Sequence, residues 1–67
     1  MITISINGNT LQFETNISVT MLIEHMRLGN KRIAIERNGE IIPRSQFDAQ
    51  KLSDGDKLEI VVAVGGG

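Results

Sequence analysis

The 67-residue sequence contains no cysteine, no tryptophan and no tyrosine, and it has one histidine and one proline. Without cysteine the chain forms no disulfide, offers no thiolate ligand and performs no thiol redox chemistry of its own. A single imidazole, His25, does not make a metal site, and no serine lies in the nucleophile-elbow pattern of a hydrolase. We therefore expect a protein that is not an enzyme and that binds neither metal nor cofactor.

Charge and hydropathy exclude further classes. Seven basic and eight acidic residues give a net charge of -1, which offers no electrostatic footprint for nucleic acid or an anionic membrane. The sequence has no run of 18 apolar residues, and residues 1–6 lack the basic and continuous apolar regions of a signal peptide. No phosphate-binding glycine spacing is present. These features predict a cytoplasmic location and no contact with nucleic acid or membrane.

Two β-hairpins are predicted from alternating apolar and polar residues. The first covers residues 1–15 and turns at Asn7-Gly8, a dipeptide that tolerates positive φ at both central positions of a type I′ turn. The second covers residues 32–42, turns at Asn38-Gly39 and is closed by Pro43, which cannot donate a ladder hydrogen bond. A third alternating stretch, from Lys57 to Val64, predicts a final strand.

One helix is predicted between the hairpins, because apolar residues fall at positions 19, 22, 23 and 26 with the spacing of one helical stripe. Ser18 is the expected N-cap, and Gly29-Asn30 the expected end of a helix of about ten residues. Met21 and Met26 are expected to fill core gaps, and His25 to be a partly exposed helical side chain.

The remaining stretch, residues 44–52, has no clean period and predicts a loop or a single helical turn. The side chains of Phe47 and Leu52 are expected to pack beneath it. Asp54-Gly55-Asp56 is a predicted turn with solvated carboxylates. The whole sequence predicts one α+β domain over residues 1–67: a roll in which a sheet of four to five strands packs on one helix. A final strand rich in β-branched residues belongs at the centre, and pairing with the first strand makes the sheet mixed.

The C-terminus is the one feature that points to chemistry, because the chain ends in Gly65-Gly66-Gly67. Residues without a Cβ can thread a narrow cleft and let another protein's backbone approach closely, so this flexible tail can deliver its own carboxylate. That α-carboxyl group has an ordinary pKa of about 3.5 and is a poor electrophile at neutral pH. Condensation with ATP would activate it as a mixed anhydride with AMP, which a sulfur nucleophile could displace. A merely frayed end is the alternative interpretation of the glycines.

The sequence resembles the thiamine-biosynthesis sulfur carrier proteins, small members of the ubiquitin-like β-grasp fold. The resemblance covers nearly the whole chain and is carried by Asn7-Gly8, by residues 35–44 (IERNGEIIPR), by residues 52–56 (LSDGD), and by residues 58–61 (LEIV) leading to the terminal VGGG. It implies that the carboxylate of Gly67 is adenylylated and converted to a thiocarboxylate. It also implies three kinds of partner: an adenylyltransferase of the ubiquitin-activating type, a thiazole synthase, and a sulfur donor such as a cysteine desulfurase or a related persulfide protein.

The predicted site residues fall into two groups. Gly67 is the adenylylation and thiocarboxylate site, and Gly65 and Gly66 are the residues that thread into the partner. Candidate partner contacts are Val61, Ala63, Val64, Arg37 and Arg44, where Ala63 replaces an aromatic residue that many relatives carry. Two alternatives remain open: the small subunit of molybdopterin synthase, which uses the same thiocarboxylate, and a ubiquitin-like interaction module or protein modifier.

Overall fold

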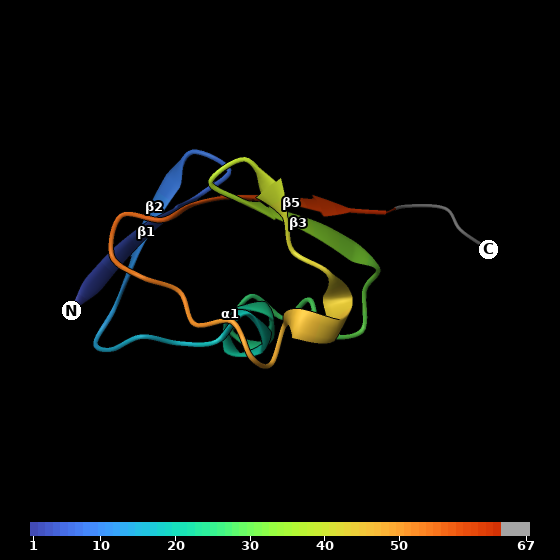
Figure 1. The fold of residues 1–67 in the computed structure, drawn as a ribbon, viewed down its shortest axis with the longest axis horizontal. Coiled ribbons are helices and arrows are strands. Elements are labelled where there is room, and N and C mark those ends of the chain that lie inside the picture. Colours follow the sequence, from blue (N-terminus) through green and yellow to red (C-terminus); the bar gives the residue numbers. More distant parts are fainter. Residues whose placement is uncertain (64–67) are drawn as a thin grey trace.

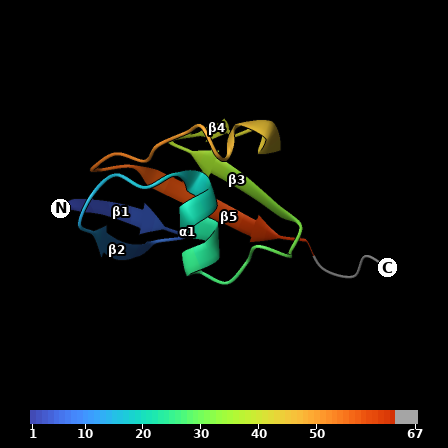
Figure 2. The ribbon, with the colours of Figure 1, turned by 90° about the horizontal axis from the view of Figure 1, so that it is seen from below.

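The computed structural model describes residues 1–63, which form one five-stranded sheet with a helix across one face (Figures 1 and 2). Along the chain the elements are β1 (Ile2–Ile6), β2 (Asn9–Phe13), α1 (Val19–His25), β3 (Ile33–Arg37), β4 (Glu40–Ile41), the 3₁₀ helix η1 (Arg44–Gln46) and β5 (Lys57–Val62). The strand order is β2-β1-β5-β3-β4. The predicted arrangement, a mixed sheet with the last strand at its centre, is confirmed: β5 runs parallel to β1, and all other neighbours are antiparallel.

Both hairpin turns have the predicted conformation, because Asn7, Gly8, Asn38 and Gly39 all have positive φ. Each turn asparagine also holds the central strand. The Asn7 side chain accepts a hydrogen bond from the backbone N–H of Ile60 and donates one to the Ile60 carbonyl, at 2.8 and 3.1 Å. On the other side of β5, Asn38 Oδ1 accepts from the backbone N–H of Lys57 at 2.9 Å. The two turns therefore hold β5 through side-chain hydrogen bonds on its two sides.

The core lies between the sheet and α1 and consists almost wholly of aliphatic side chains. Its fully buried members are Ile4, Val19, Leu22, Ile35, Leu52 and Leu58. The segment after the second hairpin closes one side of this core, because Phe47 and Leu52 are buried at 8% and 0% exposure as predicted. Backbone hydrogen bonds from Val19 to Gln50 and from Leu52 to Ile17 fix this segment beside the start of α1.

The helix begins at the predicted place and ends earlier than predicted. Ser18 caps its N-terminus by accepting a hydrogen bond from the backbone N–H of Met21. The last helical residue is His25, and Arg27 at φ +60°, rather than Gly29-Asn30, takes the left-handed position. Leu28 N–H then bonds the carbonyl of Ile23, and Arg27 N–H that of Glu24, which is the hydrogen-bond pair of a Schellman motif. Packing of the half-buried Leu28 against the core favours this early stop over a longer helix.

The two helical methionines differ. Met26 is half-buried against the core as predicted, but the prediction was wrong for Met21, whose exposed fraction is 52%. Met21 lies one position before the buried pair Leu22 and Ile23, so it points away from the sheet. His25 is exposed as expected, and its ring makes an edge contact with Phe13 at a centroid distance of 5.3 Å. None of the helices within residues 1–63 has the length and apolar character to cross a bilayer.

Candidate functional site: the end of the central strand and the open sheet face

The central strand leads directly to the C-terminus. β5 ends at Val62, and the next residue is still held to the fold, because Ala63 N–H donates to the carbonyl of Arg32, the residue before β3, at 2.9 Å. The chain is thus fixed to the middle of the sheet up to residue 63. Val64 and the glycines at 65–67 lie outside the described residues, so the predicted adenylylation and threading roles stay predictions.

The face of the sheet opposite α1 carries apolar side chains beside this exit. Val61 of β5 lies directly opposite Ala34 of β3, and opposed residues in an antiparallel pair project from the same face. Val61 is 64% exposed, as is Ile41 of the edge strand β4. The prediction that one side of the final strand lies outside the core is confirmed, and its alternative, a strand covered on both faces, is wrong.

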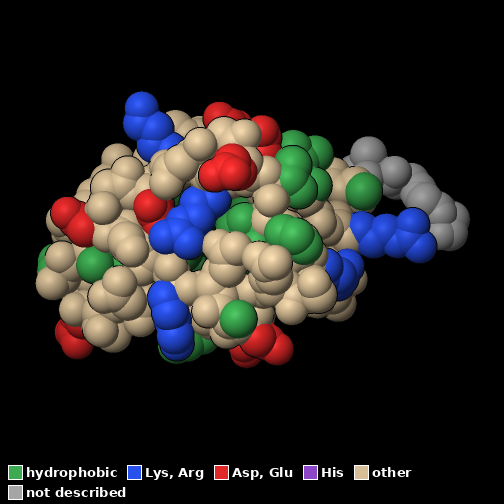
Figure 3. Space-filling model, viewed as in Figure 1, with side chains coloured by type: hydrophobic (Ala, Val, Ile, Leu, Met, Phe, Trp, Pro, Cys, Tyr) green, Lys and Arg blue, Asp and Glu red, His purple; other side chains and the backbone are tan. Residues whose placement is uncertain are grey.

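Acidic side chains share this face. Glu36 lies opposite Glu59 on one side and opposite Ile41 on the other. Figure 3 shows acidic and hydrophobic side chains next to one another along the upper side of the molecule, where the sheet lies. The open face therefore offers a contact surface that is apolar near the end of β5 and acidic further from it.

Sequence reasoning missed Ile41 and Ala34 as members of this face. The signal was present in the second hairpin: a two-residue turn at Asn38-Gly39 sets Arg37 opposite Glu40 and Glu36 opposite Ile41, which puts Ile41 on the face of Glu36. Ala34 could not be placed in the same way, because its position depends on the register between β3 and β5, whose nearest ends, Arg37 and Lys57, are 20 positions apart in the sequence.

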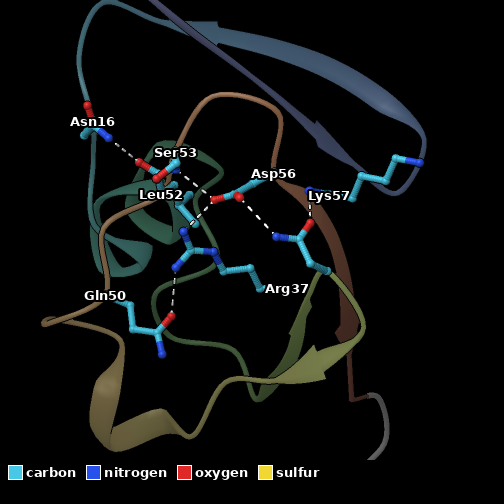
Figure 4. A network of polar contacts seen from close by, with 8 residues as sticks. Asn16, Arg37, Gln50, Leu52, Ser53, Asp56 and Lys57 are labelled. Atoms are coloured by element: carbon cyan, nitrogen blue, oxygen red, sulfur yellow. Dashed lines mark hydrogen bonds and ion pairs between the residues drawn. The ribbon is translucent and has the colours of Figure 1, made fainter.

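Arg37 is held inside the protein rather than free on its surface (Figure 4). Its guanidinium lies 2.8 Å from the carboxylate of Asp56 and donates to Gln50 at 3.0 Å, and its side chain is 23% exposed. Asp56 also accepts from the backbone N–H of Ser53 at 2.8 Å and from the Asn38 amide at 3.1 Å. The expectation of a solvated carboxylate was wrong for Asp56, which is 7% exposed, because the end of β3 with its turn and the backbone of Ser53 both bond to this oxygen pair. A partner contact by Arg37 stays a prediction, and the structure assigns this side chain a structural role.

Arg44 is exposed at the start of η1, on the helix side of the molecule. It lines a hollow of about 300 Å³ between α1 and η1, together with Lys31, Ile23, Ile33 and Phe47. The structure therefore does not bring Arg44 together with Val61, and a single flat partner surface cannot cover both. Within residues 1–63, no group of three His, Asp or Glu side chains is arranged to hold a metal ion.

A mixed five-stranded sheet in this order, folded over one helix and with its last strand at the centre, defines a ubiquitin-like β-grasp protein. The chain matches the family model described as "ThiS family" over residues 3–67. It is 34% identical over 65 residues to the sulfur carrier protein ThiS of Bacillus subtilis, covering 96% of this chain and 98% of that one. The crystal structure of the thiamine biosynthesis protein ThiS from Geobacter metallireducens superimposes with a TM-score of 0.82 at 29% identity, over 98% of this chain and all of that one.

A larger protein contains a similar stretch. The chain is 40% identical over 62 residues to a thiazole synthase of Paramagnetospirillum magneticum, covering 92% of this chain and 19% of that protein. The chain thus spans about a fifth of this relative. Because the family model covers nearly all of the sequence, including the terminal glycines, the chain belongs to the ThiS family. The resemblance noted in the sequence is confirmed.

Proposed function

We propose that this chain is the sulfur carrier of a thiamine-biosynthesis system and bears the sulfur on the C-terminal carboxylate of Gly67. The supporting observation is that the ThiS family match runs to residue 67 and so includes the three glycines that follow the central strand. The buried carboxylate of Asp56 is already bound to Arg37 and is not available for chemistry.

The proposed chemistry has three steps. The Gly67 carboxylate attacks the α-phosphate of ATP, which forms an acyl-phosphate bond and releases pyrophosphate. The outer sulfur of the donor's persulfide then attacks the carbonyl carbon, and AMP leaves with the electron pair of its oxygen, so that carrier and donor are joined by an acyl disulfide. A partner thiol finally attacks the donor's sulfur in that disulfide, forms a new disulfide with the donor and releases the C-terminal thiocarboxylate. No residue of the carrier needs to donate or accept a proton in these steps, so the carrier is a co-substrate and its partners supply the catalytic groups.

Three partners follow from this chemistry: an adenylyltransferase of the ubiquitin-activating type, a sulfur donor such as a cysteine desulfurase or a related persulfide protein, and a thiazole synthase that receives the sulfur. The last is supported by the thiazole synthases that include a stretch similar to this chain within their own length. The presence of a carrier-like stretch within a thiazole synthase is expected if the carrier and the synthase act together. All three partners act in the cytoplasm in this proposal.

The open sheet face is the docking surface that this function requires. Val61 is exposed two residues before Ala63, which still bonds to β3, so a partner that receives the tail comes within contact distance of the face around Val61. Ala34 and Ile41 extend the apolar area across β3 and β4. Ala63 continues the same stretch toward the glycines, and a contact by Val64 is proposed from the sequence alone.

The test is intact-protein mass spectrometry of the chain purified from its host without reducing or alkylating agents. We expect a fraction of the molecules to gain the mass difference between sulfur and oxygen, and fragmentation to place that gain on Gly67. The same shift should appear after incubation of the purified chain with ATP, a sulfur donor and host extract. If it stays absent under both conditions, the chain is an interaction module rather than a sulfur carrier. A stable complex with a molybdopterin synthase large subunit would instead assign it to that pathway.

A further inference from the structure

A short basic segment, residues 27–32, lies at the end of the molecule where β5 stops. It contains Arg27, Lys31 and Arg32, three of the seven basic residues of the chain, and no acidic residue. The segment leaves the foot of α1, crosses to the start of β3 and passes beside the last residues of β5 (Figure 2). Figure 3 shows basic side chains at this same end of the molecule.

The backbone of the basic segment is fixed to the fold at both ends. Leu28 N–H bonds the carbonyl of Ile23, and Lys31 N–H bonds that of Leu28, each at 3.0 Å. At the other end the Arg32 carbonyl accepts the hydrogen bond from Ala63 that holds the last described residue of the chain. The three charges are therefore carried by a segment with a defined position rather than by a loose loop.

The fold itself makes no visible use of these three charges. Arg27, Lys31 and Arg32 are all exposed, and the one ion pair within residues 1–63 joins Arg37 to Asp56. Glu24 on α1 and Asp48 after η1 line the hollow that Lys31 also lines, without an ion pair to it. Asp48 already accepts a hydrogen bond from Thr20.

From this position we infer that the basic segment contacts carboxylate side chains of the adenylating partner, around the opening through which that partner receives the tail. The inference rests on the proposed function. Four residues follow Ala63, and an extended chain of that length reaches at most about 14 Å. Whichever way the carrier is rotated, the partner surface around that opening must therefore come close to Ala63 and Arg32. Charges there interact within roughly one Debye length, about 10 Å at 0.1 M salt.

Charges at the rim of an interface act mainly on the rate of association and its salt dependence. The basic segment thus orients the carrier with its C-terminal end toward the partner before the tail enters. In this proposal the same charges have no part in the transfer of AMP, because the partner supplies the groups that act on the reacting carboxylate. The basic segment therefore affects how fast the two proteins associate and leaves the rate of the chemical step unchanged.

The experiment measures ATP–pyrophosphate exchange by the activating enzyme of the same host, with the full-length carrier as the varied substrate. The test variant is Lys31→Glu with Arg32→Glu, and the matched control is Lys51→Glu with Lys57→Glu, which makes the same change in net charge. Lys57 opens β5 and lies about 20 Å along the strand from Ala63. Thermal unfolding followed by circular dichroism confirms that both variants fold, and the neutral substitutions Lys31→Gln and Arg32→Gln replace the test variant if it does not.

We expect kcat/KM for the test variant to fall by roughly tenfold or more at 0.05 M salt, while kcat and the KM for ATP stay unchanged. The kcat/KM of this variant should also lose most of its salt dependence. The control should remain within about twofold of the unaltered carrier. An equal loss in both variants would show a general charge effect and overturn the inference. A raised KM for ATP would overturn it in favour of a contact with nucleotide phosphates. If the unaltered carrier supports no exchange at all, the proposed function fails, and this inference fails with it.

Discussion

Asp56 should contribute more to the stability of the domain than any other polar side chain described above. It is 7% exposed and receives hydrogen bonds from the Arg37 guanidinium, the Ser53 backbone and the Asn38 amide. Replacement by alanine removes all three and leaves the half-buried N–H of Ser53 without this acceptor. Hydrogen bonds to charged groups contribute about 1.5–3 kcal/mol each but are not additive when they share one carboxylate.

The expected loss for Asp56→Ala is about 3 kcal/mol, because Arg37, at 23% side-chain exposure, recovers part of its hydration. A domain of this length has a total unfolding free energy of roughly 3–10 kcal/mol, so the variant loses a large share of it. The corresponding fall in Tm is roughly 12–24 °C. Urea and thermal unfolding followed by far-ultraviolet circular dichroism measure both quantities. Glu40→Ala, which removes an exposed carboxylate from β4, is the control and should change the free energy by less than about 0.5 kcal/mol.

A double-mutant cycle tests whether Arg37 and Asp56 act as a unit. Arg37→Met alone should cost about 1–2 kcal/mol, because Asp56 keeps its other two donors. The unfolding free energy of the double variant should lie below that of Asp56→Ala by at most a few tenths of a kcal/mol. Additive losses, or an Asp56→Ala protein as stable as the unaltered chain, would refute the reasoning. Because Asp56 lies at the opposite end of β5 from Ala63, the folded variant should still accept sulfur at the normal rate below its Tm.

Three further predictions concern the helix end, the docking face and the tail. Arg27→Gly should raise the unfolding free energy by about 0.5–1 kcal/mol, since glycine adopts φ +60° without steric cost, and urea unfolding measures the gain. Val61→Asp should raise the KM of the adenylating partner for the carrier by roughly tenfold, whereas Met21→Asp, on the helix side with a similar exposed area, should not; equal effects would remove the open face as a docking surface. Gly66→Val should slow sulfur loading, followed by mass spectrometry, without changing Tm, and normal loading would refute the threading argument.

Most of the fold could be predicted from local patterns. Both hairpins were predictable from the two Asn-Gly turns, since a two-residue turn leaves one register for the strands that it joins. For the first hairpin, the alternation of Ile2, Ile4 and Ile6 also showed which face is buried. The helix end could not be predicted as well. Gly29 looked like the natural stop, but the burial of Leu28 imposed the turn two residues earlier and forced Arg27 into the left-handed region. Tertiary packing thus outweighed local propensity at this position.

The site was predicted in part. The outward position of Val61 follows from the sequence alone, because alternation along the last strand distinguishes its two sides. The roles of the terminal glycines stay predictions. The partners of Arg37 were not predictable in this way. Its carboxylate, Asp56, lies 19 positions away, and the two meet only because β3 and β5 pair with Arg37 opposite Leu58. A solvent-exposed pair and a buried pair of charges have the same sequence pattern, so only the register of the sheet separates them.

The strand order has a consequence for how the protein is made. β5 is synthesised last, yet it is the strand that joins the first hairpin to the second, and the asparagines of both turns bond to it. A nascent chain that stops before residue 57 has two separate hairpins and no continuous sheet to cover the aliphatic core. Folding of this domain must therefore follow synthesis of β5. A chain released before residue 57 cannot form the continuous sheet, so residues 1–56 are not a folding unit by themselves.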